Sequence, residues 1–386
     1  MKRVLVTIAL IAFGSTLFVR AVDPLVLKIA DSFGVTPAHA ALLITAFALP
    51  YALMQPILGA VADVFGKPRL MVTCLAIGVL ASIASAFAPT FPLLMATRVV
   101  SGAACGGVFP VAVAIVGDLF PIAERQVAIG RVVATGMMGN LVGATLAGIV
   151  GDLTNWRGAF IVTGVLALGM LVPSYRFMFE REASPPGQPR FATVLTNYRV
   201  IFTNPLAKIC FSAVFFDALV IFGLFPYMST ILQAQGETRA TITGLIIAGF
   251  GFGAVVYSFI VRRLLMWFGD RWLMVIGGFI MAGGLLLVPL QPAWPLLATI
   301  FLIMGIALFM LHGSIQIYVT ELAPSARASA MAMHSSSFFF GQAVGPIAYG
   351  FGFGHLGWLW TFGISAAVIA AVGIYAAAAL RHPQRR

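Results

Sequence analysis

The chain is 386 residues long, of which 61% are hydrophobic and only 9% are charged, and its mean hydropathy is +1.02. So few charged side chains cannot cover a water-exposed surface of this size, which excludes a soluble globular protein and indicates an integral membrane protein. The net charge of +11 would suit a nucleic-acid-binding protein, but the placement of the charges along the chain excludes that class.

Apolar runs of membrane-spanning length recur along the whole chain. A helix needs about 20 apolar residues to cross the hydrocarbon core, and inside lipid the backbone must satisfy its own hydrogen bonds, so each run predicts a transmembrane helix. The sequence predicts an all-α membrane protein with twelve transmembrane helices, over residues 4–30, 38–62, 69–88, 92–118, 125–150, 157–179, 205–233, 240–266, 270–289, 293–319, 327–353 and 357–380.

One long polar interruption separates the sixth expected span from the seventh. It covers residues 180–204 and contains Ser-Pro-Pro-Gly-Gln-Pro-Arg at 184–190, a composition typical of a linker. The sequence therefore predicts an N-terminal six-helix bundle (1–179), a cytoplasmic linker (180–204) and a C-terminal six-helix bundle (205–386).

The two expected bundles carry related sequences, which repeat about 202 residues apart. Internal repeats define an architecture, and transporters built from two related halves bind their substrate near the membrane midplane, so the repeat predicts a transporter. Each repeat contains a row of glycines at three- to five-residue spacing. Small residues of this kind let helices approach closely, and a proline adds a kink, so the rows could serve helix packing or act as a hinge. The residues assigned to helix packing are Gly139, Gly143, Gly148, Gly341, Gly345 and Pro346.

The distribution of Lys and Arg predicts the topology. If the N-terminus is cytoplasmic, 18 of the 23 basic residues lie on the cytoplasmic side, and the opposite side carries only Lys28, Arg157 and Arg239. This is the positive-inside pattern, which predicts a multi-pass protein of the inner (plasma) membrane with both termini in the cytoplasm. The basic charge then marks topology and contact with anionic lipid headgroups, and it requires no nucleic acid partner.

Three short motifs resemble signatures of the major facilitator superfamily. The segment from Gly59 to Arg69 resembles the loop between spans two and three, with departures at Val64 and Pro68. Arg98 followed by Gly102 resembles the fourth-span signature. The fifth-span motif associated with antiporters is matched by Gly130, Gly139, Gly143 and Gly148, with Ala144 in place of its proline and Ala147 in place of a glycine.

The resemblance covers essentially the whole chain and implies the major facilitator fold, with twelve helices in two pseudo-symmetric six-helix bundles. Within the superfamily it resembles the twelve-helix drug:proton antiporter and sugar-efflux branch. The altered fifth-span motif departs from the antiporter pattern at the proline position, now Ala144.

The loop motif also suggests a conformational latch at the cytoplasmic side. A carboxylate such as Asp63 can cap the N-terminus of a facing helix, and we expect the start of span eleven near Arg327 as its target. A contact of this kind must break during transport, which is how a two-state element works. Solvated loop charges that only fix topology are the alternative. The residues assigned to the latch are Gly59, Asp63, Gly66, Lys67, Arg69, Asp118 and Arg327.

Charged residues within the spans are costly and therefore mark functional candidates. Span one carries Arg20 and Asp23 on one helical face, span seven carries Asp217, and span four carries Arg98. We assign these four residues to proton coupling. Contact of the carboxylates with a cationic or polyhydroxylated substrate, and a purely structural ion pair with an arginine, remain open for Asp23 and Asp217.

A set of polar and aromatic residues at membrane depth could line a substrate cavity, with packing as the alternative for each. Imidazoles titrate near neutral pH, so the two histidines could also carry protons. The candidates are Tyr51, Gln55, Asn140, Phe216, Tyr227, His312, Gln316, His334 and Gln342.

The sequence lacks the signatures of an enzyme or of an ATP-driven pump. It contains no Gly-rich run ending in Gly-Lys-Ser/Thr, no metal-ligand cluster and no nucleophile–base set, so we expect no cofactor and no metal. Cys74, Cys105 and Cys210 stand in apolar context without paired spacing and are expected to pack as free thiols.

The function predicted from the sequence is secondary active transport by a monomer, in the form of proton-coupled efflux of a drug, sugar or metabolite by alternating access. Its partners are a small-molecule substrate, protons and the lipid bilayer. A proton symporter or facilitator that imports a metabolite is the alternative within transporters, and a membrane sensor that does not transport is the alternative outside them.

Overall fold

The computed structural model describes residues 2–179, 191–323 and 326–380, and these residues form helices and short connections with no β-strand among them. The chain divides into two compact units. Unit 1 contains Met1–Leu195 and Arg239–Gly244, and unit 2 contains Thr196–Thr238 and Leu245–Arg386.

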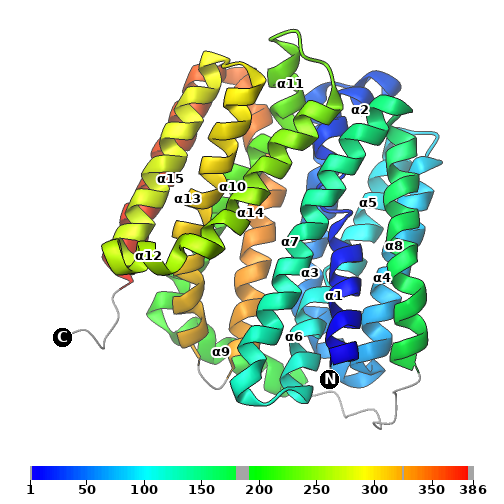
Figure 1. Cartoon of the computed structure of the whole chain (residues 1–386), viewed down its shortest axis with the longest axis vertical. Helices are drawn as coiled ribbons and strands as arrows, with labels where there is room; N and C mark the ends of the chain where they lie inside the picture. Colours follow the sequence, from blue (N-terminus) through cyan, green and yellow to red (C-terminus); the bar gives the residue numbers. More distant parts are fainter. Residues whose placement is uncertain (1, 180–190, 324–325, 381–386) are drawn as a thin grey trace. The chain divides into compact units, whose positions relative to one another are not determined.

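Unit 1 is a bundle of long helices in which the first and fourth expected spans are broken (Figure 1). The first span stops after Thr16, whose hydroxyl donates to the Ala12 carbonyl, and it resumes at Asp23, where Pro24 starts a 3₁₀ turn. The helices are α1 (Lys2–Thr16), η1 (Asp23–Leu25), α2 (Val26–Phe33), α3 (Pro37–Phe65), α4 (Lys67–Ala86), α5 (Phe91–Cys105), α6 (Val108–Leu119), α7 (Ile122–Leu153) and α8 (Trp156–Phe179).

Unit 2 has the same all-helical character. Its elements are α9 (Phe191–Thr203, which crosses the boundary between the units), α10 (Pro205–Leu224), η2 (Phe225–Tyr227), α11 (Met228–Gln233), α12 (Ala240–Leu287, whose first residues up to Gly244 belong to unit 1), η3 (Val288–Leu290), α13 (Trp294–Glu321), α14 (Arg327–His355) and α15 (Trp358–Ala379). Residues 191–203 were expected to belong to the linker. They form α9 because this stretch, unlike 184–190, has no proline or glycine.

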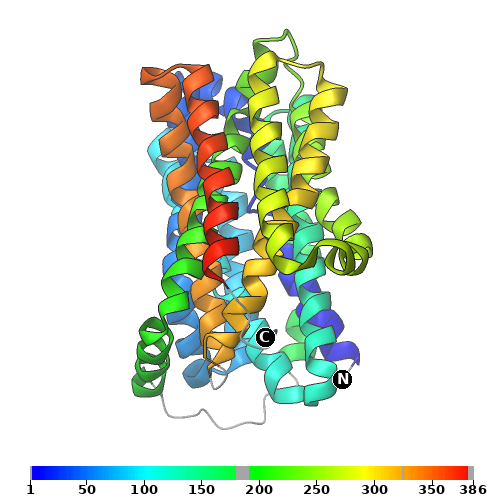
Figure 2. The same cartoon turned by 90° about the vertical axis from the view of Figure 1, so that its left-hand side faces the viewer.

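α12 is one assigned helix of 48 residues, but it contains two spans. At about 1.5 Å per residue it would be about 72 Å long, more than twice the roughly 30 Å hydrocarbon core. Gly269 interrupts it with φ 71° and ψ 167°, a conformation that favours glycine. The ribbon of this helix, yellow-green in Figure 2, turns sharply partway along its course. The break lies between the expected spans 240–266 and 270–289.

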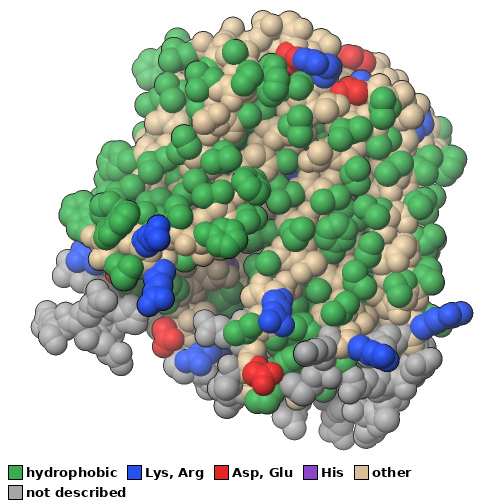
Figure 3. Space-filling model, viewed as in Figure 1, with side chains coloured by type: hydrophobic (Ala, Val, Ile, Leu, Met, Phe, Trp, Pro, Cys, Tyr) green, Lys and Arg blue, Asp and Glu red, His purple; other side chains and the backbone are tan. Residues whose placement is uncertain are grey.

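Within the described residues, nine helices are long and apolar enough to cross a membrane, with both legs of α12 counted as one. α1 is apolar but shorter, since its span continues through the break into α2. Exposed large hydrophobic residues, such as Leu80, Phe259 and Trp360, show that apolar surface faces outward, as lipid requires. Figure 3 shows hydrophobic side chains over the helix flanks and charged ones gathered near helix ends.

Candidate functional site

The break in the first span places a buried ion pair inside unit 1. Arg20 Nη1 lies 3.4 Å from Asp23 Oδ2, and both side chains are almost entirely removed from solvent. Asp23 Oδ1 has no hydrogen-bond partner among the described residues. A buried carboxylate with a free oxygen is a chemically reasonable proton acceptor, because a proton removes its charge.

Arg98 on α5 lies beside the same break. Its Nη2 donates to the Phe18 carbonyl at 3.0 Å, and its guanidinium lies 4.4 Å from the centre of the Phe47 ring. The carbonyl of Phe18 is available because α1 has already ended. Arg98 therefore supports the broken backbone by a hydrogen bond, and among the described residues its guanidinium forms no ion pair with a carboxylate.

Unit 2 has a separate cluster made by three helices. Asp217 on α10 contacts His312 on α13, with Oδ2 and Nδ1 2.9 Å apart, and His334 on α14 packs edge-on against His312 with ring centres 4.8 Å apart. Asp217 is fully buried, and neither its Oδ1 nor His334 Nε2 has a hydrogen-bond partner in the described part of the chain. The sequence expected Asp217, His312 and His334 to be functional but could not show that they meet.

This contact fixes the chemistry available to His312. A carboxylate at Nδ1 favours the tautomer with a proton on that nitrogen, and Nε2 is then the atom that can accept a further proton. Phe338 packs against the imidazole, with ring centres 5.0 Å apart.

The other expected cavity residues have different environments. Gln55 is fully buried in α3 between Pro50 and Pro56, and neither atom of its amide group has a hydrogen-bond partner among the described residues. The buried Asn140 Oδ1 likewise has none there. Tyr51 and Gln342 are buried, Gln316 is half-buried and Phe216 is 42% exposed.

Tyr227 has a defined structural contact. Its hydroxyl donates to the Pro346 carbonyl at 2.7 Å, which joins η2 to α14 within unit 2. Two phenylalanines close to Tyr227 in the sequence, Phe222 and Phe225, pack with Phe250 in the core of unit 2, and their ring centres are 5.0 to 5.7 Å apart. This aromatic group is interior packing.

Three of the expected latch residues make contacts inside their own units, namely Lys67, Asp118 and Arg327. Lys67 Nζ lies 2.6 Å from Asp118 Oδ2, joining α4 to α6. Arg327 contacts Glu321 at 3.7 Å and donates from Nε to the Thr320 carbonyl at 3.1 Å. The side chain of Asp63 lies outside the described residues, so its pairing with the start of span eleven stays a prediction. Gly59, Gly66 and Arg69 flank it, and Gly66 (φ 86°) separates α3 from α4.

The glycine rows lie where backbones approach closely. A Cβ at Gly139 or Gly143 would meet the carbonyl of Phe13 or Leu17 on the first span, and a Cβ at Gly148 would meet the Ala240 carbonyl. In unit 2, Gly345 faces Gly223, and Gly341 faces the Phe215 carbonyl. These contacts support the packing interpretation of both rows.

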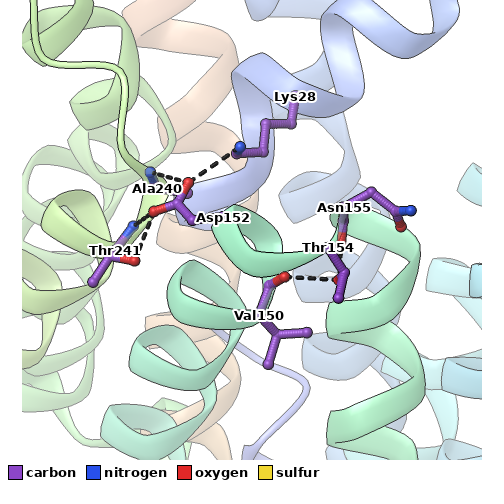
Figure 4. Close-up of polar contacts among 7 residues, drawn as sticks. All are labelled: Lys28, Val150, Asp152, Thr154, Asn155, Ala240 and Thr241. Carbon is purple, nitrogen blue, oxygen red and sulfur yellow. Dashed lines mark hydrogen bonds and ion pairs between the residues drawn. The ribbon is translucent and has the colours of Figure 1, made fainter.

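A polar cluster around Asp152, which the sequence analysis missed, is also in unit 1 (Figure 4). Its carboxylate accepts from the backbone N–H groups of Ala240 and Thr241 at 2.9 and 2.7 Å and from the Thr241 hydroxyl at 2.6 Å, and it lies 3.1 Å from Lys28 Nζ. The carboxylate of α7 therefore caps the positive N-terminus of α12. The sequence did contain a signal for this cluster, because Asp152 is an acidic residue at the end of an expected span, on the side predicted to carry few charges.

Comparisons with known proteins identify the family. The sequence model of the Major Facilitator Superfamily matches residues 8–241 and 209–386. The chain belongs to the major facilitator superfamily. Major facilitator relatives include an uncharacterised MFS-type transporter, YfhI, of Bacillus subtilis, 26% identical over 63% of this chain and 60% of that protein. A protein named probable sugar efflux transporter in Helicobacter pylori is 26% identical over 90% of this chain and 88% of its own length.

The fold of a solved superfamily member agrees. The crystal structure of a bacterial homologue of the human lysosomal transporter Spinster superposes with a TM-score of 0.69 at 18% identity, covering 97% of this chain and 94% of that one. The prediction of a major facilitator fold is thus confirmed. The family match and the apolar helices show that the chain is a multi-pass membrane protein of this superfamily.

Proposed function

We propose that this protein is a proton-coupled secondary transporter that exports a small organic molecule by alternating access. The contact between Asp217 and His312 carries the proposal, because it puts an acid and a base of complementary chemistry in hydrogen-bond contact inside a membrane bundle. Proton carriers in transporters are typically buried Asp, Glu and His residues of this kind.

The coupling would work through the partners of Asp217. When Oδ1 of Asp217 takes up a proton, the carboxylate loses its charge. Its hydrogen bond with His312 then weakens, and the imidazole can turn toward another acceptor. His334 packs directly against that ring and offers an unpartnered nitrogen among the described residues. If the substrate binds one protonation state of the protein more tightly than the other, thermodynamic linkage requires that substrate binding change the proton affinity of the protein by the same factor.

Asp23 supplies a second candidate carrier, in unit 1. Its pairing with Arg20 keeps it compensated when ionised, and its free oxygen could take a proton. Arg98 supports the same break through Phe18. We assign Asp217 the primary role because its partner is itself titratable, whereas Arg20 stays charged.

Unpartnered buried amides support a substrate with several hydrogen-bonding groups. Gln55 and Asn140 both carry buried polar atoms that have no hydrogen-bond partner among the described residues. A buried donor or acceptor without a hydrogen bond costs about 1–3 kcal/mol. Hydroxyl groups of a sugar-like molecule would satisfy them. A relative named as a probable sugar efflux transporter supports the same class. We propose that the protein acts as a monomer in the inner membrane with both termini in the cytoplasm.

Proteoliposomes with an imposed pH gradient and an internal pH dye test the proposal. A panel of sugars and amphiphilic cations is added to the vesicles. With wild-type protein, we expect one of these two classes to dissipate the pH gradient. The direction in which protons move then distinguishes antiport from symport. Asp217→Asn should abolish this release. Asp31→Asn, an exposed aspartate of α2, is the matched control and should leave it intact. Unchanged coupling in Asp217→Asn would refute the assignment.

A further inference from the structure

An exposed stripe of mixed character runs along the part of α12 that precedes the break at Gly269, in unit 2. Its five side chains stand at positions i, i+3, i+4, i+7 and i+8, which is the spacing of one helix face. The exposed fraction is 81% for Phe259, 68% for Met266 and 70% for Trp267, and the two arginines between them are exposed as well. The α12 stripe consists of Phe259, Arg262, Arg263, Met266 and Trp267.

The two arginines of the stripe have no counter-charge among the described residues. Neither the Arg262 guanidinium nor the Arg263 guanidinium has a hydrogen-bond or ion-pair partner there. The nearest acid in the sequence, Asp270, is already engaged, since its Oδ2 accepts from the Tyr318 hydroxyl at 2.6 Å. The two adjacent guanidinium groups therefore remain available to bind an anion from outside the chain.

The stripe lies where α12 leaves the hydrocarbon core of the membrane. No charged residue occurs in the stretch 240–261, which is about 33 Å long at 1.5 Å per residue, and the core is about 30 Å thick. Arg262 and Arg263 are therefore expected at the level of the lipid headgroups. The second leg of α12 begins with Asp270 and Arg271, so both legs place charged residues at the bend.

The bend that follows the stripe is fixed to other helices of unit 2. The Tyr318 hydroxyl of α13 donates to Asp270, and Arg271 donates from Nε to the Ala377 carbonyl of α15 at 2.9 Å. These two contacts hold the residues directly after Gly269, where the helix is interrupted. The outward direction of the stripe is thus stabilised by packing contacts on both α13 and α15.

The headgroup layer of an anionic bilayer suits both kinds of side chain in the stripe. Water would leave the apolar groups of Phe259, Met266 and Trp267 uncovered, and hydrocarbon would leave two arginines charged and unpaired. Tryptophan and arginine both favour the interface, where apolar contact and anionic phosphate lie side by side. Guanidinium groups bind phosphate oxygens in a planar, two-point geometry, whereas a headgroup without net charge would leave the positive charge of the pair uncompensated.

We propose that the α12 stripe binds an anionic phospholipid, whose phosphate is held by Arg262 and Arg263. Phe259 contacts the upper acyl chains of this lipid, and Trp267 lies in the headgroup layer. The bilayer itself supplies the lipid. The proposal does not depend on the direction or coupling of transport, so its test is independent of the test above.

Brominated lipids measure which lipid lies against the stripe. Bromine at the upper end of an acyl chain quenches tryptophan fluorescence on contact, and the difference between wild type and Trp267→Phe isolates the signal of Trp267. The full chain is reconstituted in bilayers with equal amounts of phosphatidylglycerol and phosphatidylcholine, and the bromine is carried first by one lipid and then by the other. Trp267 should be quenched more strongly by brominated phosphatidylglycerol than by brominated phosphatidylcholine.

Variants of the two arginines test the source of this preference. Arg262→Gln and Arg263→Gln should each lower the ratio of the two quenching efficiencies about fivefold, because one arginine near an anionic lipid surface contributes about 1 kcal/mol. The double Gln variant should bring the ratio to about one, and the double Lys variant, which keeps both charges, should restore a preference for phosphatidylglycerol. Arg199→Gln removes an exposed arginine of α9 as the matched control and should leave the ratio unchanged.

Three results would overturn the proposal. Equal quenching by the two lipids in wild type, or an unchanged ratio in the double Gln variant, would show that the arginines select no anionic lipid. Absence of quenching of Trp267 by either lipid would show that the stripe faces water or another protein. An equal fall of the ratio in Arg199→Gln would show diffuse charge attraction. All substituted side chains are exposed, and an unchanged melting temperature checks that each variant is folded.

Discussion

Replacing Asp152 by Asn should loosen the first turn of α12. The carboxylate accepts three hydrogen bonds from Ala240 and Thr241 and pairs with Lys28. An amide in its place keeps one acceptor oxygen but loses the charge that faces the positive helix end. Hydrogen bonds to charged groups contribute about 1.5–3 kcal/mol each, so a net loss of about 2 kcal/mol is expected after partial replacement by water.

Hydrogen exchange followed by mass spectrometry measures this loss directly. Exchange of the Ala240 and Thr241 amides requires that they leave the carboxylate, and a change of about 2 kcal/mol makes that opening about 30-fold more frequent. A peptide that covers residues 239–246 should therefore exchange much faster in Asp152→Asn. Asp31→Asn removes an exposed aspartate of α2 and should leave the peptide unchanged.

A double-mutant cycle apportions the effect. Thr241→Val removes the hydroxyl donor but keeps the backbone N–H, and combining it with Asp152→Asn should cost less than the sum of the two single changes, because both act on one contact. Lys28→Met should have a smaller effect than Asp152→Asn, since the Lys28 side chain is 34% exposed and its ion pair is screened by water. Equal exchange in wild type and Asp152→Asn would refute the assignment of this carboxylate as a helix cap.

Four further substitutions test the packing and latch assignments by thermal unfolding in detergent. Gly143→Ala should destabilise the protein by about 1–3 kcal/mol because its Cβ has no room, whereas Gly130→Ala in the same helix meets nothing within 4 Å and should raise the melting temperature slightly. Tyr227→Phe should cost about 1 kcal/mol through loss of its buried hydrogen bond to α14, and no change would refute that role. Lys67→Met should change stability by at most about 1 kcal/mol, since Asp118 is 57% exposed, and a large loss would contradict a surface ion pair.

Much of the architecture could be predicted from the sequence because bilayer thickness sets the length of each span. The two legs of α12 were expected as separate spans, and Gly269 supplies the break between them. The interruption of the first span between Thr16 and Asp23 was not expected, because residues 4–30 were taken as one apolar run, and Pro24 at the start of the 3₁₀ turn was the available signal. α9 was also missed, since its segment was judged with its proline-rich neighbour.

The site was harder to predict, since distances between helices leave no trace in one sequence. Asp217 and His312 are 95 residues apart in the chain, and each was a candidate for separate reasons. Their contact depends on how α10 and α13 rotate within the bundle, which many small packing contacts decide. Asp152 was overlooked because an acid at a helix end usually meets water, and two of its partners are backbone N–H groups, which carry no sequence signal.

The most direct test of the central claim measures proton movement by His312 and Asp217 variants in one proteoliposome experiment. Asp217→Asn and His312→Gln should each abolish substrate-dependent release of an imposed pH gradient, and the double variant should be no worse than either, because the two residues act as one unit. Substrate binding, followed as a shift in melting temperature, should persist in at least one single variant. Full coupling in both single variants would contradict the account.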